Sequence, residues 1–158
     1  MSVRGSPVRL LGRLRHEAGQ ARKELGDGIR QEGIIEAAPE QVYAVLTDGQ
    51  KFAAATGMPA RIGEKEGDAF SLFGGRIEGR QIELVPGERV VRAWRFGREH
   101  PDEWGAGVYS VVRFTLTPEG TATKLVIDHD GIPSEWEDHI AAGYPSFYRE
   151  PLVKYLAG

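Results

Sequence analysis

The chain has 158 residues, a length at which one domain can bury roughly 70% of the surface of its unfolded chain. Apolar residues make up 41% and charged residues 27%, the balance of an ordinary globular protein. There is no cysteine, which excludes disulfides, thiolate nucleophiles and cysteine-bound zinc. No apolar run approaches the roughly 20 residues that a membrane span requires. We therefore expect a cytoplasmic protein without a membrane span.

The net charge of −3 is unevenly distributed along the chain. Residues 1–25 hold six Arg or Lys against two Glu, so they carry +4 and the remainder carries −7. An acidic main part argues against nucleic acid as a partner, because phosphate binding needs a basic surface.

The first 28 residues predict a basic amphipathic leader, and residues 29–158 predict the domain itself. Apolar residues of the leader recur at helical spacing: Val8, Leu11, Leu14, Ala18, Ala21 and Leu25. The leader lacks the continuous apolar core of a secretory signal peptide. It fits a short helix packed on the domain, an organelle transit peptide, or a helix lying on a membrane surface.

The first part of the domain predicts a strand and two short helices. The segment 29–37, "IRQEGIIEA", is typical of a strand. Pro39 suits the first turn of a helix over 40–48, and Gly49 separates that helix from a shorter one over 50–57.

The pattern then changes from helical spacing to the two-residue alternation of strands. Five runs are bounded by Gly, Pro or charged turns: 68–75, 76–85, 89–97, 108–117 and 122–131. A short edge strand is expected near 60–64. In the fourth run the apolar Val108, Val112 and Phe114 alternate with polar residues, which indicates one buried face and one exposed face.

The last segment predicts a helix that opens at 134–137, "SEWE". Gly143 and Pro145 should kink it, and Pro151 removes one further backbone hydrogen bond. Its apolar and aromatic residues share one face: Tyr144, Phe147, Tyr148, Pro151, Leu152 and Tyr155. This order of elements predicts an α+β fold in which a bent antiparallel sheet curls around a long C-terminal helix, because both apolar faces are then buried.

Three stretches follow one another in a familiar order: "AAPEQVYAVLTD", "GGRIEGRQIELVPGERVVRAWRF" and "GIPSEWEDHIAAGYPSFYREPLVKYL". Together they resemble the family of activators of heat-shock protein 90 ATPase, and most of all the C-terminal domain of that co-chaperone, within the START-like (SRPBCC) superfamily. The resemblance covers about residues 29–156. It is carried by Pro39, Val42, Tyr43, Gly79, Leu84, Val85, Pro86, Val91, Trp94, Arg95, Phe96, Gly131, Ile132, Pro133, Gly143, Tyr148, Glu150 and Tyr155.

The resemblance implies a helix-grip fold, in which the sheet wraps the C-terminal helix and leaves a cavity between them. It implies three alternative functions: binding of a small apolar or aromatic ligand, contact with a heat-shock protein 90 homologue, or a cyclase-like or hydrolase-like activity in the same cavity. Tyr144 stands where the family commonly has tryptophan.

The aromatic face of the helix is expected to lie against the sheet, either as ordinary core or as one wall of the cavity. The candidates for the cavity wall are Phe70, Leu72, Arg92, Trp94, Phe96, Val112, Phe114, Tyr144, Phe147 and Tyr148. An apolar pocket with a few polar points is what a small-molecule site requires, and buried tyrosine hydroxyls supply such points. Replacing Trp94 or Tyr148 by Ala should abolish ligand uptake.

Four arginines alternate with aromatic residues in one predicted strand: Arg89, Arg92, Arg95 and Arg98. The first and third share one face and the second and fourth the other, so they form no basic stripe. Pairing with Glu78 and Glu83 on the neighbouring strand is the expected role for most of them. Arg92 is expected to reach the rim of the cavity or to bind an anionic group of a ligand. Contact of the outer face with a protein should depend on exposed charges such as Arg95 or Glu83.

No catalytic residue, metal site or cofactor is predicted. His129 and His139 lie beside carboxylates in 128–131 and 135–139, but sequence neighbours on a strand point to opposite faces. The sequence lacks the zinc-protease histidine pair and the lysine of a phosphate loop, and Ser110 has no nucleophile elbow around it. We therefore expect a non-enzymatic protein.

Overall fold

The computed structural model describes residues 25–157, so the predicted leader lies outside the described residues except for its last four. The elements in chain order are β1 (Ile29–Ile35), α2 (Pro39–Thr47), α3 (Gly49–Thr56), β2 (Arg61–Ile62), β3 (Ala69–Leu72), the short turn η1 (Phe73–Gly75), β4 (Ile77–Val85), β5 (Arg89–Phe96), β6 (Ser110–Glu119), β7 (Ala122–Asp130), α4 (Ser134–Tyr144), the π-helical turn η2 (Pro145–Arg149) and α5 (Glu150–Ala157). Every predicted strand and helix of the domain is present. Two runs differ in extent: the predicted strand 68–75 ends at Leu72 and continues as η1, and β6 begins at Ser110, so that Val108 lies before the strand and is exposed.

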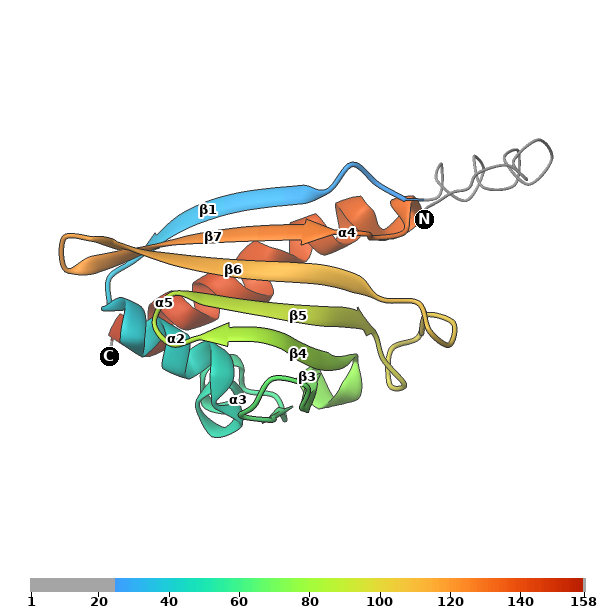
Figure 1. The fold of residues 1–158 in the computed structure, drawn as a ribbon, viewed down its shortest axis with the longest axis horizontal. Helices are drawn as coiled ribbons and strands as arrows, with labels where there is room; N and C mark the ends of the chain where they lie inside the picture. The colour runs from blue at the N-terminus through green and yellow to red at the C-terminus, as the bar shows by residue number, and fades with distance from the viewer. Residues whose placement is uncertain (1–24, 158) are drawn as a thin grey trace.

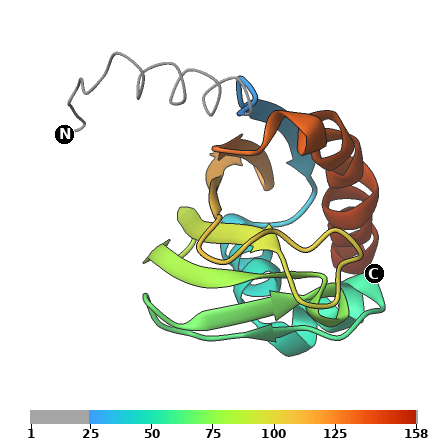
Figure 2. The ribbon, with the colours of Figure 1, turned by 90° about the vertical axis from the view of Figure 1, so that its right-hand side faces the viewer.

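The strands form one seven-stranded antiparallel sheet in the order β1-β7-β6-β5-β4-β3-β2. The sheet curves around the C-terminal helix, which runs along its concave side (Figures 1 and 2). The helices α2 and α3 pack against α5 and close one end of the concave side (Figure 1). The predicted α+β helix-grip architecture is therefore confirmed.

The bend of the sheet has two local causes in β4. The pairing of β4 with β5 shifts between Gln81 and Glu83, a bulge of the kind that bends and twists a strand. A Cβ at Gly79 would lie 1.8 Å from the carbonyl oxygen of Ala93 and 2.9 Å from the ring of Phe70. Only glycine therefore permits this close approach of β5 and β3.

The predicted kink of the C-terminal helix takes the form of one π-helical turn between α4 and α5. The backbone N–H of Glu150 donates to the carbonyl of Pro145, five residues earlier. Pro145 has no N–H, so the carbonyl of Ala141 loses its helical donor. The side chain of Gln31 on β1 donates to that carbonyl at 2.8 Å. Pro145 thus leaves the Ala141 carbonyl free to accept the hydrogen bond from Gln31, which ties the helix to the edge strand β1.

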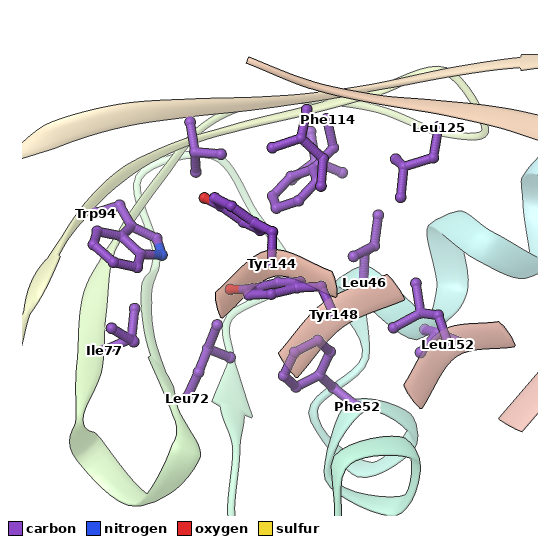
Figure 3. Packing of buried hydrophobic residues seen from close by; sticks show 14 of the residues in the cluster. Leu46, Phe52, Leu72, Ile77, Trp94, Phe114, Leu125, Tyr144, Tyr148 and Leu152 are labelled. Atoms are coloured by element: carbon purple, nitrogen blue, oxygen red, sulfur yellow. The ribbon is translucent and has the colours of Figure 1, made fainter. Parts of the chain in front are cut away.

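The face that the helix buries is narrower than the predicted stripe. Tyr144, Tyr148 and Leu152, spaced four residues apart, are buried, whereas Phe147 and Tyr155 are 53% and 38% exposed. In a regular α-helix, residues four apart drift about 40° around the axis at each step. A π turn holds more residues per turn and offsets this drift. The three buried residues therefore form one row toward the core (Figure 3).

The hydrogen bond from Gln31 of β1 to the Ala141 carbonyl should contribute to the stability of the fold. Gln31→Ala should lower the free energy of unfolding by about 1–2 kcal/mol, because the Ala141 carbonyl then has no donor. In a Pro145→Ala background the same change should cost less, because residue 145 then supplies an N–H of its own. Urea denaturation of the four proteins measures the difference. Equal losses in both backgrounds would contradict this account.

Candidate functional site: a pocket beneath the C-terminal helix

A pocket of about 420 Å³ lies where β4, β5 and η1 meet α4 and η2. Its walls are mostly apolar and include Phe73, Ile77, Trp94, Phe96, Ile140 and Phe147. Arg76, His100 and His139 also contribute to its lining. The volume falls within the range of sites that hold small molecules, roughly 300–1,000 Å³.

Half of the predicted cavity residues line this pocket, namely Trp94, Phe96, Tyr144, Phe147 and Tyr148. The other half, Phe70, Leu72, Arg92, Val112 and Phe114, lie on the same inner face but are enclosed in the core. The difference arises from α2 and α3, which fill that end of the concave side. Phe52 of α3, for example, packs against Tyr148 with ring centroids 5.6 Å apart. The alternation of apolar and polar residues along the strands predicted the inner face of the sheet. It could not show which part of that face is covered by the side chains of α2 and α3.

Several residues that line the pocket were not predicted from the sequence, among them Phe73, His100 and His139. Phe73 lies in η1 with a φ of 55°, an uncommon backbone conformation for a residue other than glycine. The neighbouring Gly74 and Gly75 are typical of a turn, and this turn directs the Phe73 ring toward the C-terminal helix, where it meets Phe147. His100 follows β5 and stacks on Phe96 at 3.8 Å between ring centroids. His139 of α4 lies 6.5 Å from the same ring.

Arg92 does not reach the rim, and this expectation was wrong. Its side chain is fully buried and lies over the ring of Phe70, 5.0 Å from the centroid. Nη2 donates to the carbonyl of Leu46 at 2.5 Å and Nε to Oε1 of Gln81 at 2.7 Å. Because Leu46 lies in the last turn of α2, the guanidinium binds the negative end of that helix. Burial lowers the pKa of Arg92 to about 10, so the group remains charged at neutral pH.

Two buried polar atoms at the pocket wall have no hydrogen-bond partner among the described residues: Nε1 of Trp94 and the hydroxyl of Tyr148. Both side chains are only 4% exposed. Burial raises the pKa of Tyr148, while the charge of Arg92 and the Trp94 N–H lower it in part. The indole nitrogen is thus near the phenol without the geometry of a hydrogen bond, and it points toward the two tyrosine oxygens (Figure 3). Unpaired buried donors favour a ligand that brings an acceptor.

A chain of buried hydrogen bonds lies behind this wall. The hydroxyl of Tyr144 lies 2.6 Å from Nδ1 of His129, and Nε2 of His129 lies 2.7 Å from Oγ of Ser110. Ser110 donates its own hydrogen to the carbonyl of Trp94 at 2.8 Å. Nε2 of His129 must therefore carry a hydrogen, and Nδ1 accepts from Tyr144. The chain joins β5, β6 and β7 to the C-terminal helix.

This arrangement does not form a serine nucleophile. A catalytic serine must give its proton to the histidine, whereas Ser110 gives it to a backbone carbonyl and faces a protonated nitrogen. Burial lowers the pKa of His129 to about 3 and raises that of Tyr144 well above its usual value. All three groups are therefore neutral at physiological pH. The hydrogen bonds from Ser110 through His129 hold the Tyr144 ring at the pocket wall.

The predicted cross-strand pairs are present. Arg89 lies 2.8 Å from a carboxylate oxygen of Glu83, and Arg95 lies 2.9 Å from one of Glu78. Arg95 was expected to be exposed, but only 6% of it is. The side chain of Glu83 is 44% exposed and remains available on the outer face.

The loop 97–109 covers Arg95. The guanidinium donates to the backbone carbonyls of Trp104 and Gly105. Trp104 packs against Phe96, with ring centroids 5.1 Å apart, and so extends the aromatic cluster behind the pocket. A charge that the strand pattern assigns to the outside is thus buried by a segment with no regular pattern of its own.

The carboxylates beside His129 point away from it, as strand parity predicted. Asp128 pairs with Arg30 of β1 at 2.9 Å, while the imidazole faces the interior. Within residues 25–157, no three His, Asp or Glu side chains are grouped so that they hold a metal ion. The helices of this described part are too short or too polar to cross a membrane.

A bent antiparallel sheet gripping a C-terminal helix, with a pocket between the two, defines a START-like domain. The family model "Activator of Hsp90 ATPase homolog 1-like protein" matches residues 36–157, and the chain belongs to this family.

The chain is similar to curated proteins that carry the same description. It is 28% identical over 114 residues to activator of 90 kDa heat shock protein ATPase homolog 1 of Homo sapiens, covering 72% of this chain and 32% of that protein. It is 34% identical over 100 residues to the homologue of Dictyostelium discoideum, covering 63% of this chain and 25% of that protein. The chain thus spans about a quarter to a third of the length of these relatives.

Solved structures share the fold. An HSP90 activator from Plasmodium falciparum superposes with a TM-score of 0.74 at 23% identity, covering 84% of this chain and 97% of that one. A protein from Mesorhizobium loti superposes with a TM-score of 0.68 at 24% identity, covering 82% and 96%.

The buried histidine makes stability depend on pH. The folded chain keeps His129 neutral down to about pH 3, whereas in the unfolded chain it takes up a proton below about pH 6.5. The contribution of His129 to the free energy of unfolding is therefore full above pH 6.5 and is lost as the pH falls toward 3. Urea denaturation between pH 7 and pH 4 should show a shallower decline for His129→Leu than for the wild type. Parallel curves would contradict this expectation.

Proposed function

We propose that this domain binds a small apolar or aromatic molecule in the pocket between the sheet and the C-terminal helix. The observation that supports the proposal is the pair of unpartnered polar atoms, Trp94 Nε1 and the Tyr148 hydroxyl, in an otherwise largely apolar wall. An ordinary core pairs its buried polar groups, whereas a binding site keeps a few for its ligand. Phe73 and Phe147, whose rings meet edge to face at 5.5 Å, suit an aromatic guest.

We propose binding rather than conversion. The buried serine and histidine are neutral and joined in the wrong direction for nucleophilic attack. In this proposal the protein is cytoplasmic and binds its ligand without a cofactor.

Blocking the pocket from its rim tests the proposal. Ser146 is an exposed residue of its lining, so Ser146→Trp should fill the pocket without disturbing the core. Fluorescence titration with the neutral probe N-phenyl-1-naphthylamine should show binding to the wild type and a loss of about tenfold or more in this variant. Val153→Trp adds the same ring at an exposed helix position away from the pocket and should bind the probe like the wild type. Equal binding by all three proteins would place the probe elsewhere and refute the proposal.

Native mass spectrometry of gently purified protein addresses the natural ligand. A bound mass that is lost on denaturation, and that Tyr148→Ala no longer retains, would support the pocket as its site.

A second candidate function is contact with a heat-shock protein 90 homologue. Family membership favours it, since curated relatives are named as activators of that chaperone's ATPase. Val108 and Tyr109, which directly precede β6, and Val111 within it are 40%, 46% and 43% exposed and give this end of the strand an apolar surface.

The apolar surface at the start of β6 allows a direct test. Val111→Asp should weaken capture of the heat-shock protein 90 homologue from the same organism by about tenfold, because it introduces a charge into an apolar contact. Ile34→Asp, an equally exposed apolar site on β1, is the matched control. Identical capture by both variants and the wild type would exclude this surface.

A further inference from the structure

We propose that the ligand of this pocket is an organic acid, with an apolar body against the aromatic walls and a carboxylate head that accepts hydrogen bonds from Trp94 and Tyr148 next to the buried charge of Arg92. This inference rests on the proposed ligand-binding function and names the class of the ligand.

The first argument is the unbalanced charge in the interior. Arg92 is fully buried, and no carboxylate of the described residues forms an ion pair with it. Its partners are a carbonyl, an amide oxygen and an aromatic face, and Nη1 has no partner among the described residues. A buried cation compensated only by dipoles attracts an anion strongly, because the surrounding dielectric constant is low.

The second argument is the position of that charge. Arg92 and Trp94 are two residues apart on β5, and both point to the inner face. Among the ionisable groups around Arg92, Tyr148 interacts most strongly with its charge. Tyr148 lines the pocket, whereas Arg92 is enclosed in the core. The Tyr148 hydroxyl and Trp94 Nε1 belong to lining residues and have no partner among the described residues, and Nη1 of Arg92, in the core, is a third such donor.

The third argument is the sign of the pocket lining. The domain carries most of the chain's acidic residues, yet none of the described residues that line the pocket is Asp or Glu. Its charged or titratable side chains are Arg76, His100 and His139, besides the two tyrosines. Nothing in the wall repels a carboxylate, whereas a cationic ligand would meet only positive or neutral groups.

The donor inventory selects a carboxylate over a neutral acceptor. An ionised carboxylate offers about four lone-pair sites and a full charge, so it can accept from both the indole N–H and the phenol while lying in the field of the guanidinium. An amide of the same shape carries no charge and offers one acceptor oxygen, and its N–H₂ group can donate only to the phenol oxygen, because the indole and the guanidinium are donors alone. The pocket should therefore distinguish an acid from its amide.

The experiment compares naphthalene-1-acetate with naphthalene-1-acetamide, two compounds of one shape that differ in charge. Isothermal titration of the full chain at pH 7 should show the acid bound about tenfold or more tightly than the amide, the ratio that one charge-assisted hydrogen bond supplies. Tyr148→Phe removes a hydroxyl that bonds to no described residue, so this variant should fold and should lose most of the preference. Arg92→Met should lose it as well.

The matched control is Arg89→Met, which removes one positive charge from the same strand but on the outer face, where Arg89 pairs with Glu83. This variant should keep the full preference for the acid.

Equal affinity of the wild type for acid and amide would overturn this inference and leave the proposed binding function standing. Failure of both compounds to bind would overturn the two together. A preference for the acid that survives Tyr148→Phe and Arg92→Met but disappears in Arg76→Met would overturn the assignment, since the head group would then lie at Arg76.

Discussion

The packing of one row of side chains on the C-terminal helix against the inner face of the sheet organises this domain. Tyr144, Tyr148 and Leu152 lie in that row, where Tyr144 meets His129 of β7 and Tyr148 meets Phe114 of β6. The row stays straight because Pro145 and the π turn correct the drift of an α-helix. Pro145 also leaves the Ala141 carbonyl free to accept from Gln31, so this one residue sets both the path of the helix and its hydrogen bond to β1.

The polar groups that this packing buries fall into three situations with different consequences. The chain from Tyr144 through His129 to Ser110 is fully paired, neutral and rigid. Arg92 is charged and held by dipoles, since it binds the carboxyl end of α2. Trp94 and Tyr148 carry polar atoms without a partner among the described residues, and both line the pocket. Of the buried atoms without a partner among the described residues, those of Trp94 and Tyr148 belong to lining residues of the pocket, where they leave bonding capacity for another molecule.

Membership in the family of activators of Hsp90 ATPase fixes the fold, but it assigns no function to the pocket. The outer face of the sheet and the space beneath the helix are two separate surfaces of this domain. The exposed apolar residues at the start of β6 belong to the first, and the aromatic pocket belongs to the second. The two proposed functions therefore use separate surfaces and do not exclude each other.

The sequence alone determined the order of the elements, their types and the inner face of each strand, because hydrophobic periodicity is a local property that survives folding. It also predicted that arginines of β5 pair with Glu78 and Glu83 on the neighbouring strand, and in the structure Arg95 and Arg89 do so. Position along that face was decided only by the tertiary structure. A residue of the inner face can lie in the enclosed core, as Phe114 does, or line the pocket, as Phe96 does. Which of the two occurs depends on where α2 and α3 fill the concave side.

The burial of Arg92 and Arg95 and the bonding of His129 likewise required the tertiary structure. Each depends on a segment distant in the sequence: the end of α2 for Arg92, the loop 97–109 for Arg95 and the C-terminal helix for His129. A pattern within one strand carries no information about such partners. The sequence therefore determined which faces are apolar, and the three-dimensional arrangement decided which polar groups on them are paired and which remain open to a ligand.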